Sequence, residues 1–256
     1  MARRCSRFAA TGSIFTVRHG ERADHADSGW HKTAERPHDP PLTPLGLAQA
    51  ASTGLALKDK RVDAVYSSPF TRCMQTASAI AKHHGLKLRV EPGIGEMLAD
   101  CEKHGWGFIE NPYDEAFSAA HLSSLFDVDT SYTPLWDTPT RGAPSRKRPA
   151  SALQLSFPEE WEDCKARYQR TLTEVQATEP FAVLVTHGAG VMSIAESALP
   201  SDEVDDCNYC CITQLHQAGG GAWRCTQHGT AHHDTGPTAS HDKLVLQRSP
   251  HPKTLG

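Results

Sequence analysis

The chain has 256 residues, of which 38% are hydrophobic, and a formal net charge of −4 at pH 7. This length suits one α/β domain with an insertion, or two small domains. The negative charge removes any general reason to bind nucleic acid or a membrane surface, so an anion would need a local cluster of basic side chains. No run of eighteen apolar residues occurs, and we expect no membrane partner.

Cysteine usage and the two ends of the chain bear on location and domain limits. The eight cysteines are scattered through a chain too large to need a disulfide framework, so we expect free thiols and a cytoplasmic protein. Residues 1–13 are basic and aperiodic, and the last residues are polar and rich in histidine. We therefore expect one domain over 14–237 between a flexible N-terminus (1–13) and a flexible tail (238–256).

The first predicted strand carries a candidate site. The apolar run Ile-Phe-Thr-Val from residue 14 ends in Arg18-His19-Gly20, and Arg22 follows. Ligands of open α/β sheets bind at the carboxyl ends of strands, and a glycine there lets the backbone approach a ligand closely. Because burial of unpaired cations is costly, an imidazole between two guanidinium groups indicates an anion site.

A second strand end repeats the pattern. The apolar run 181–186 ends in His187-Gly188, so two strands present a histidine at one edge of the sheet. Between them, a strand is predicted over 62–68 and a helix over 72–83. Arg72 opens that helix, where free backbone N–H groups favour a negative ligand.

The remaining pattern predicts a three-layer α/β/α sandwich with a mainly parallel central sheet. Residues 23–41 lack periodicity and predict a loop beside the site, and Thr43 and Pro44 predict the N-cap and first turn of the next helix. From about 97 to 156 the chain is rich in loops, which predicts an insertion over the active site. The other expected elements are strands over 86–91, 181–187, 210–216 and 222–227 and helices over 43–58, 159–178 and 190–199.

Three separated motifs resemble the histidine phosphatase (phosphoglycerate mutase-like) superfamily. They are Arg18-His19-Gly20, Ser67-Ser68-Pro69 followed by Arg72, and His187-Gly188. The stretches 18–22 (Arg-His-Gly-Glu-Arg), 91–96 and 128–134 narrow the resemblance to the phosphatase domain of Sts-type proteins, which carry ubiquitin-associated and SH3 domains. The likeness runs from about Ser13 to about Pro237, nearly the whole chain, and residues 14–237 are accordingly expected to form a histidine phosphatase domain.

The resemblance implies a role for each candidate residue. His19 would be the nucleophile that forms a phosphohistidine, and Arg18, Arg22, Arg72 and His187 would bind phosphate oxygens. Glu96 would be the acid and base, with His187 as the further catalytic group. Spacing alone does not distinguish Glu96 from Glu21, Glu91 or Asp100. Three guanidinium groups supply the positive charge, so no metal and no cofactor is expected. Sts-type domains form dimers, so the resemblance implies a homodimer that no residue pattern demonstrates.

The leading hypothesis is a metal-independent phosphomonoesterase of the histidine acid phosphatase type. Its phosphorylated substrate would be a phosphotyrosyl protein or a small phosphometabolite. Met97-Leu98-Ala99-Asp100 differs from the stretch that follows the acid in mutases of the superfamily. A phosphoglycerate mutase or sugar-bisphosphate phosphatase is therefore the second hypothesis. The third is a catalytically silent, phosphate-binding adaptor.

Overall fold

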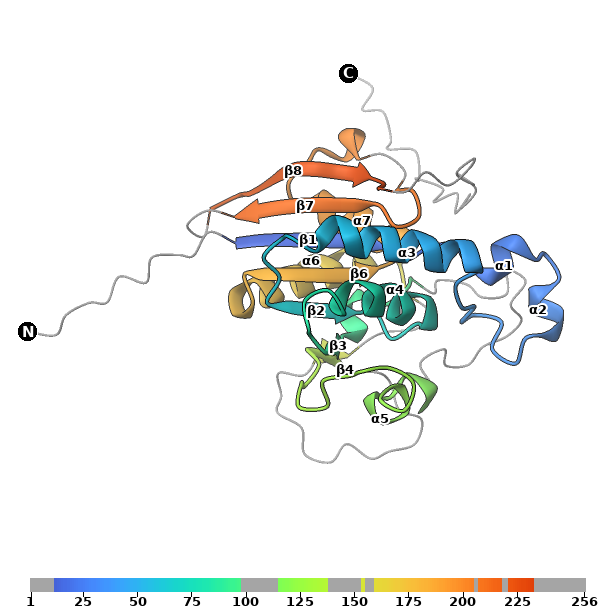
Figure 1. Ribbon diagram of the computed structural model, residues 1–256. Helices are drawn as coiled ribbons and strands as arrows, with labels where there is room; N and C mark the ends of the chain where they lie inside the picture. Colours follow the sequence, from blue (N-terminus) through green and yellow to red (C-terminus); the bar gives the residue numbers. More distant parts are fainter. Residues whose placement is uncertain are drawn as a thin grey trace, which may run out of the picture.

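The computed structural model describes residues 12–97, 115–137, 153–154, 159–204, 207–217 and 221–232. Within them, six strands form a sheet in the order β3-β2-β6-β1-β7-β8 (Figure 1). The first four in this order are parallel, whereas β7 is antiparallel to β1 and β8 to β7. The bounds are β1 (Gly12–Arg18), β2 (Ala64–Ser67), β3 (Leu88–Val90), β6 (Phe181–Thr186), β7 (Ile212–Gln217) and β8 (Trp223–Thr230).

Helices cover both faces of this sheet, which confirms the predicted α/β class with a mainly parallel sheet. α3 and α4 lie on one face and α6 and α7 on the other (Figure 1). The α-helices are α1 (Ala23–Ala26), α2 (Trp30–Thr33), α3 (Pro44–Leu57), α4 (Thr71–Ala81), α5 (Ala119–Leu122), α6 (Trp161–Thr178) and α7 (Gly188–Ala195). The 3₁₀ turns are η1 (Pro92–Ile94), η2 (Glu115–Phe117) and η3 (Ser201–Glu203), and β4 (Trp136–Asp137) pairs with β5 (Leu153–Gln154).

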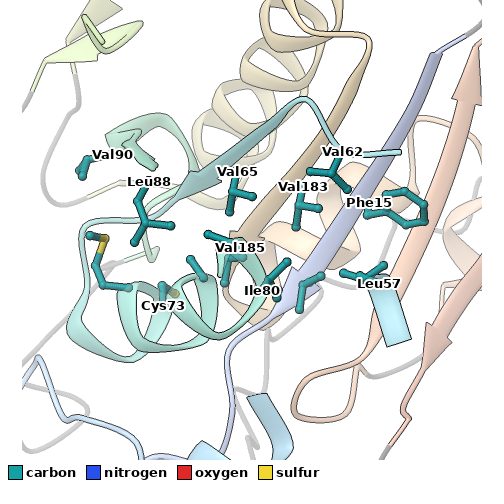
Figure 2. Packing of buried hydrophobic residues seen from close by; sticks show 14 of the residues in the cluster. Phe15, Leu57, Val62, Val65, Cys73, Ile80, Leu88, Val90, Val183 and Val185 are labelled. Carbon is teal, nitrogen blue, oxygen red and sulfur yellow. The ribbon is translucent and has the colours of Figure 1, made fainter. Parts of the chain in front are cut away.

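Strand side chains alternate between two hydrophobic cores. Phe15, Val183 and Val185 point to the face packed by α3 and α4, as Figure 2 shows. Ile14 and Leu184 point to the opposite face, where they meet the apolar side of α6. Because successive strand residues face opposite sides, a central strand buried on both must be apolar throughout. This requirement explains the apolar run 181–185 of β6 and the largely apolar run 14–17 of β1, in which Thr16 is the one polar residue.

The start of α3 is pressed against the turn that follows β1. Thr43 is the N-cap and accepts a hydrogen bond from the Gly46 backbone N–H at 2.9 Å, which confirms the predicted helix start. The Thr43 N–H also donates to the carbonyl of Glu21 at 3.0 Å. A side chain on Gly46 would place its Cβ 2.3 Å from that same Glu21 oxygen. Only glycine therefore permits this approach, two residues beyond His19.

The structure departs from the predicted pattern in detail. The segment predicted as a loop over 23–41 contains the single helical turns α1 and α2, and β1 starts at Gly12 instead of Ile14. Much of the predicted insertion (98–114, 138–152 and 155–158) lies outside the described residues, as do 1–11 and 233–256 with the predicted flexible ends. Among the described helices, none is long and apolar enough to cross a membrane.

We predict that Gly46→Ala lowers the free energy of unfolding by about 1 to 3 kcal/mol, although alanine is normally the better helix residue. The added methyl group meets backbone at Glu21 and has no flexible neighbour to displace. Chemical denaturation monitored by circular dichroism measures the change. The control is Ala48→Ser at an exposed site of the same helix, expected to stay within about 0.5 kcal/mol of the wild type. Equal stability of both variants would contradict the prediction.

Candidate active site

The site lies where three neighbouring strands end. β1 and β6 pair in parallel with Arg18 opposite Thr186, so the next residues, His19 and His187, leave the sheet side by side. The His19 N–H donates to the Thr186 carbonyl at 3.0 Å, and the Ser68 N–H after β2 donates to the Val185 carbonyl at 3.0 Å. The structure thus brings together the two histidines, which are far apart in the sequence.

His19 is a buried, neutral imidazole. Its ring is 5.3 Å from that of His187 between centroids, in an edge-to-face arrangement. Burial, with the positive charge of Arg72 as the next cause, holds the pKa of His19 well below its ordinary value. Its Nδ1 lies 2.7 Å from the Gly20 carbonyl, which can only accept, so Nδ1 carries the proton. The Nε2 lone pair is therefore available to an electrophile.

His187 is held from both sides. Its Nε2 is 2.8 Å from the Ser68 hydroxyl, and its Nδ1 is 3.1 Å from Oε2 of Glu96. Burial lowers the pKa of His187 to about 4, against the opposing effect of the Glu96 carboxylate. The ring is thus neutral at pH 7, and its Nδ1 lies 3.1 Å from both Oε2 of Glu96 and Nη2 of Arg72.

Glu96 joins the second histidine to Arg72. Its Oε2 lies 3.1 Å from Nη2 of Arg72. Burial opposes ionisation of this carboxyl, but His187 and Arg72 outweigh it, and the pKa lies well below the usual range. Of the alternative carboxylates, Glu91 instead accepts from Tyr132 and three backbone N–H groups, and Glu21 accepts from Thr43. Asp100 lies outside the described residues.

The three arginines are fixed by different partners. Arg72, fully buried, has its Nη1 3.9 Å from Asp39, a carboxylate that also accepts from the Thr71 N–H at 2.8 Å. Asp39 thus caps the helix end that the sequence predicted to be open. Arg22 binds Asp24 through two hydrogen bonds of 2.9 and 2.5 Å. Arg18 donates to the Cys207 carbonyl and lies over the Tyr209 ring, 4.6 Å from its centroid.

The electrostatics of the site favour an anion. The ligand atoms of His19, Glu96 and His187 all lie within 4.8 Å of one another, a spacing that a metal ion could also use. The positive charges of all three arginines, however, act to lower the pKa of His19. The same potential that repels a proton from His19 repels a metal cation and attracts a phosphate. The donors fit a tetrahedral oxyanion better than a metal.

A family model matches part of this chain. The model of the histidine phosphatase superfamily (branch 1) matches residues 14–125. Residues 14–125, less than half of the chain, therefore resemble the histidine phosphatase superfamily. The match includes the Arg18-His19-Gly20 and Ser68-Pro69 motifs, whereas His187 lies beyond it.

Individual relatives extend the superfamily match toward the C-terminus. The human ubiquitin-associated and SH3 domain-containing protein A is 27% identical over 241 residues, covering 77% of this chain and 33% of that protein. The ecdysteroid-phosphate phosphatase of Drosophila melanogaster is 25% identical over 263 residues, covering 86% of this chain and 32% of that protein. This chain thus spans about a third of the length of both relatives.

A solved structure supports the fold. The ecdysone phosphate phosphatase from Bombix mori, in complex with tungstate, superposes with a TM-score of 0.56 at 17% identity. The likeness covers 92% of this chain and 99% of that chain. The two proteins therefore share the same α/β fold.

Several site residues escaped sequence reasoning. Ser68 belongs to the Ser67-Ser68-Pro69 motif, but the motif does not indicate its hydrogen-bond partner. In the structure its hydroxyl pairs with His187. Asp39 and Tyr209 had no signal at all, because each is isolated in an irregular segment. Tyr209 lies 5.9 Å from the His19 ring between centroids, and its hydroxyl contacts His25.

We predict that the His187 ring of the ligand-free protein titrates at a pKa of about 4 and is neutral at pH 7. Addition of vanadate should raise this pKa, because a nearby anion favours the imidazolium. ¹⁵N–¹H correlation spectra of the ring nitrogens between pH 4 and 8 measure both values. The signal is assigned by its disappearance in His187→Gln. A protonated ring at pH 7 without vanadate, or a pKa unmoved by it, would contradict the prediction.

Proposed function

We propose that this chain is a metal-independent phosphomonoesterase that hydrolyses phosphate esters through a phosphohistidine on His19. The observation that carries the proposal is a neutral, oriented imidazole surrounded by guanidinium groups and next to a carboxylate. Relatives whose names describe phosphatases support the same reaction class. Substrates are expected among phosphotyrosyl proteins and small phosphometabolites.

The first step is displacement at phosphorus. The phosphate binds to Arg18, Arg22, Arg72 and His187, and its charge is spread over oxygens that these donors reach. Nε2 of His19 attacks the phosphorus, the N–P bond forms and the bond to the leaving oxygen breaks. The hydrogen bond from Nδ1 to the Gly20 carbonyl stabilises the positive charge that develops on the ring. Positioning and charge stabilisation thus supply most of the catalysis.

Glu96 is the proton donor for the leaving oxygen and later the proton acceptor for water. Without ligand it is ionised because Arg72 and His187 bind it. A bound dianionic phosphate takes over these partners and adds negative charge nearby, and both effects raise the pKa of Glu96. Glu96 then takes up a proton from solvent, and the resulting carboxyl group gives this proton to the leaving oxygen. In the second step the carboxylate takes a proton from water, whose oxygen attacks the phosphohistidine and frees inorganic phosphate.

The position of Glu96 argues against the silent adaptor. Its carboxylate is directed at the two histidines, within 4.8 Å of a ring nitrogen of each, as an acid acting at the same phosphorus requires. An adaptor needs the cations but has no use for a proton donor there. We therefore favour turnover over binding alone.

We predict that the wild type hydrolyses p-nitrophenyl phosphate in EDTA and that His19→Ala lowers kcat by at least roughly 10⁴-fold, because the nucleophile is lost. Phosphohistidine is labile in acid, so the reaction with ³²P-labelled substrate is quenched with denaturant at alkaline pH. The label should be trapped on the wild type only. The control is His121→Ala, an exposed histidine of α5. Full activity in His19→Ala would refute the proposal, and phosphate binding without turnover would indicate the adaptor.

Supplying 3-phosphoglycerate to the same preparation separates phosphatase from mutase. A phosphomonoesterase releases inorganic phosphate, whereas a mutase produces the isomeric phosphoglycerate with little free phosphate. Isomer as the main product would favour the second hypothesis. A sugar bisphosphate and a phosphotyrosyl peptide, assayed in parallel by phosphate release, compare the substrate classes.

We predict that Arg72→Lys lowers kcat/KM by about 10²-fold, since lysine keeps the charge but loses the planar pair of donors. Arg72 is fully buried and contacts both Glu96 and His187, so a shorter reach leaves neither contact intact. The matched control is Arg61→Lys, whose side chain is 66% exposed, pairs with Asp63 and lies over the Phe181 ring. Similar kinetics for both variants would contradict a phosphate-binding role for Arg72.

A further inference from the structure

We propose that Arg167 and Tyr168 of α6 position Glu96 for proton transfer, through the backbone of residues 93–95. Neither side chain belongs to the phosphate-binding group. The inference rests on the proposed function, because it concerns the acid of that reaction.

The backbone before Glu96 is held at every carbonyl. Nη1 of Arg167 donates to the carbonyls of Gly93 and Gly95 at 2.9 and 3.2 Å, and the Tyr168 hydroxyl donates to Gly95 at 2.5 Å. The Thr186 hydroxyl donates to the carbonyl between them, that of Ile94, at 2.7 Å. Three consecutive carbonyl groups therefore receive buried side-chain donors, immediately before the proposed acid.

Arg167 is itself fixed. Its Nε and Nη2 bind Glu159 at 2.8 and 2.6 Å in a two-pronged ion pair, and its side chain is 2% exposed. A charged pair buried in this way contributes little net stability compared with apolar residues of the same size. Its value lies in geometry, since the planar guanidinium fixes the direction of each donor.

Close packing around Gly93 fixes the segment that leads to Glu96. Gly93 has no room for a side chain, because a Cβ there would lie 2.5 Å from the Thr171 hydroxyl of α6 and 2.3 Å from the Trp136 ring. From the other side, Glu91 accepts the Gly93 N–H at 2.8 Å. The segment cannot shift without breaking these contacts, and a displacement of about 1 Å at a reacting group can cost 10²-fold in rate.

Leaving-group dependence tests the inference, because only a poor leaving group needs the proton. Phenyl phosphate requires protonation of its oxygen, whereas 2,4-dinitrophenyl phosphate departs as the anion. The value to compare is kcat/KM, which reports formation of the phosphohistidine and excludes its hydrolysis, where Glu96 acts as base for every substrate. We expect Arg167→Lys to lower kcat/KM about 10²-fold on phenyl phosphate and less than about 3-fold on dinitrophenyl phosphate. A purely structural role would lower both rates equally, and that result would overturn the inference.

Two further variants keep the test decisive. Tyr168→Phe removes one hydroxyl without changing charge or shape, so it tests the same selectivity if Arg167→Lys does not fold. Arg170→Lys, on an exposed position of the same helix, is the matched control and should leave both rates unchanged. Unselective loss in Tyr168→Phe, or selectivity in the Arg170 control, would overturn the inference.

Glu96→Gln separates the inference from the proposed function. It should show the same selectivity, and adding Arg167→Lys to it should cause no further selective loss, because the acid is already gone. Selectivity in Glu96→Gln but in neither α6 variant would overturn the inference alone. No selectivity in Glu96→Gln itself would overturn the acid role in the proposed function, and the inference with it.

Discussion

The parallel pairing of β1 with β6 is the constraint on which the site depends. Six residues of each strand are in register, and each strand ends in a His-Gly pair one residue beyond the last partners. If one of these strands slipped by one residue along the other, its side chains would each point to the opposite face of the sheet. Core packing therefore enforces the alignment. The hydrophobic effect thereby fixes the distance between His19 and His187, without any direct attraction between the rings.

Placing three arginines beside two histidines has an electrostatic cost that the chain offsets with its own carboxylates. Asp24 binds Arg22, while Asp39 and Glu96 lie next to Arg72. These acids keep Arg22 and Arg72 from being buried without partners, which would destabilise the fold by several kcal/mol. Because Glu96 is both a partner of Arg72 and the proposed acid, phosphate binding and the protonation of Glu96 are coupled. Burial in turn keeps His19 unprotonated and able to attack.

The sequence was informative where chemistry coincides with periodicity. The apolar strands ending in His19 and His187, and the helix start at Thr43 and Pro44, follow from local rules, and the structure has each of them. Glu96 could be chosen only by resemblance, because its surroundings are irregular and its partners lie 24 and 91 residues away in the sequence. Asp39 as the cap of α4 was missed for the same reason. Contacts between irregular segments produce no periodic pattern in the sequence from which they could be predicted.

The two faces of the sheet contribute differently to the site. The face of α3 and α4 supplies Arg72 directly and shapes the turn after His19 through the close approach of Gly46 to Glu21. The face of α6 supplies no proposed phosphate ligand, yet Arg167 and Tyr168 direct polar groups at residues 93–95, which lie outside the strands. Strand register positions the histidines, but Glu96 follows a 3₁₀ turn beyond β3 and has no such register. Side-chain hydrogen bonds from α6 must therefore fix the position of the proposed acid, as strand pairing fixes the position of the proposed nucleophile.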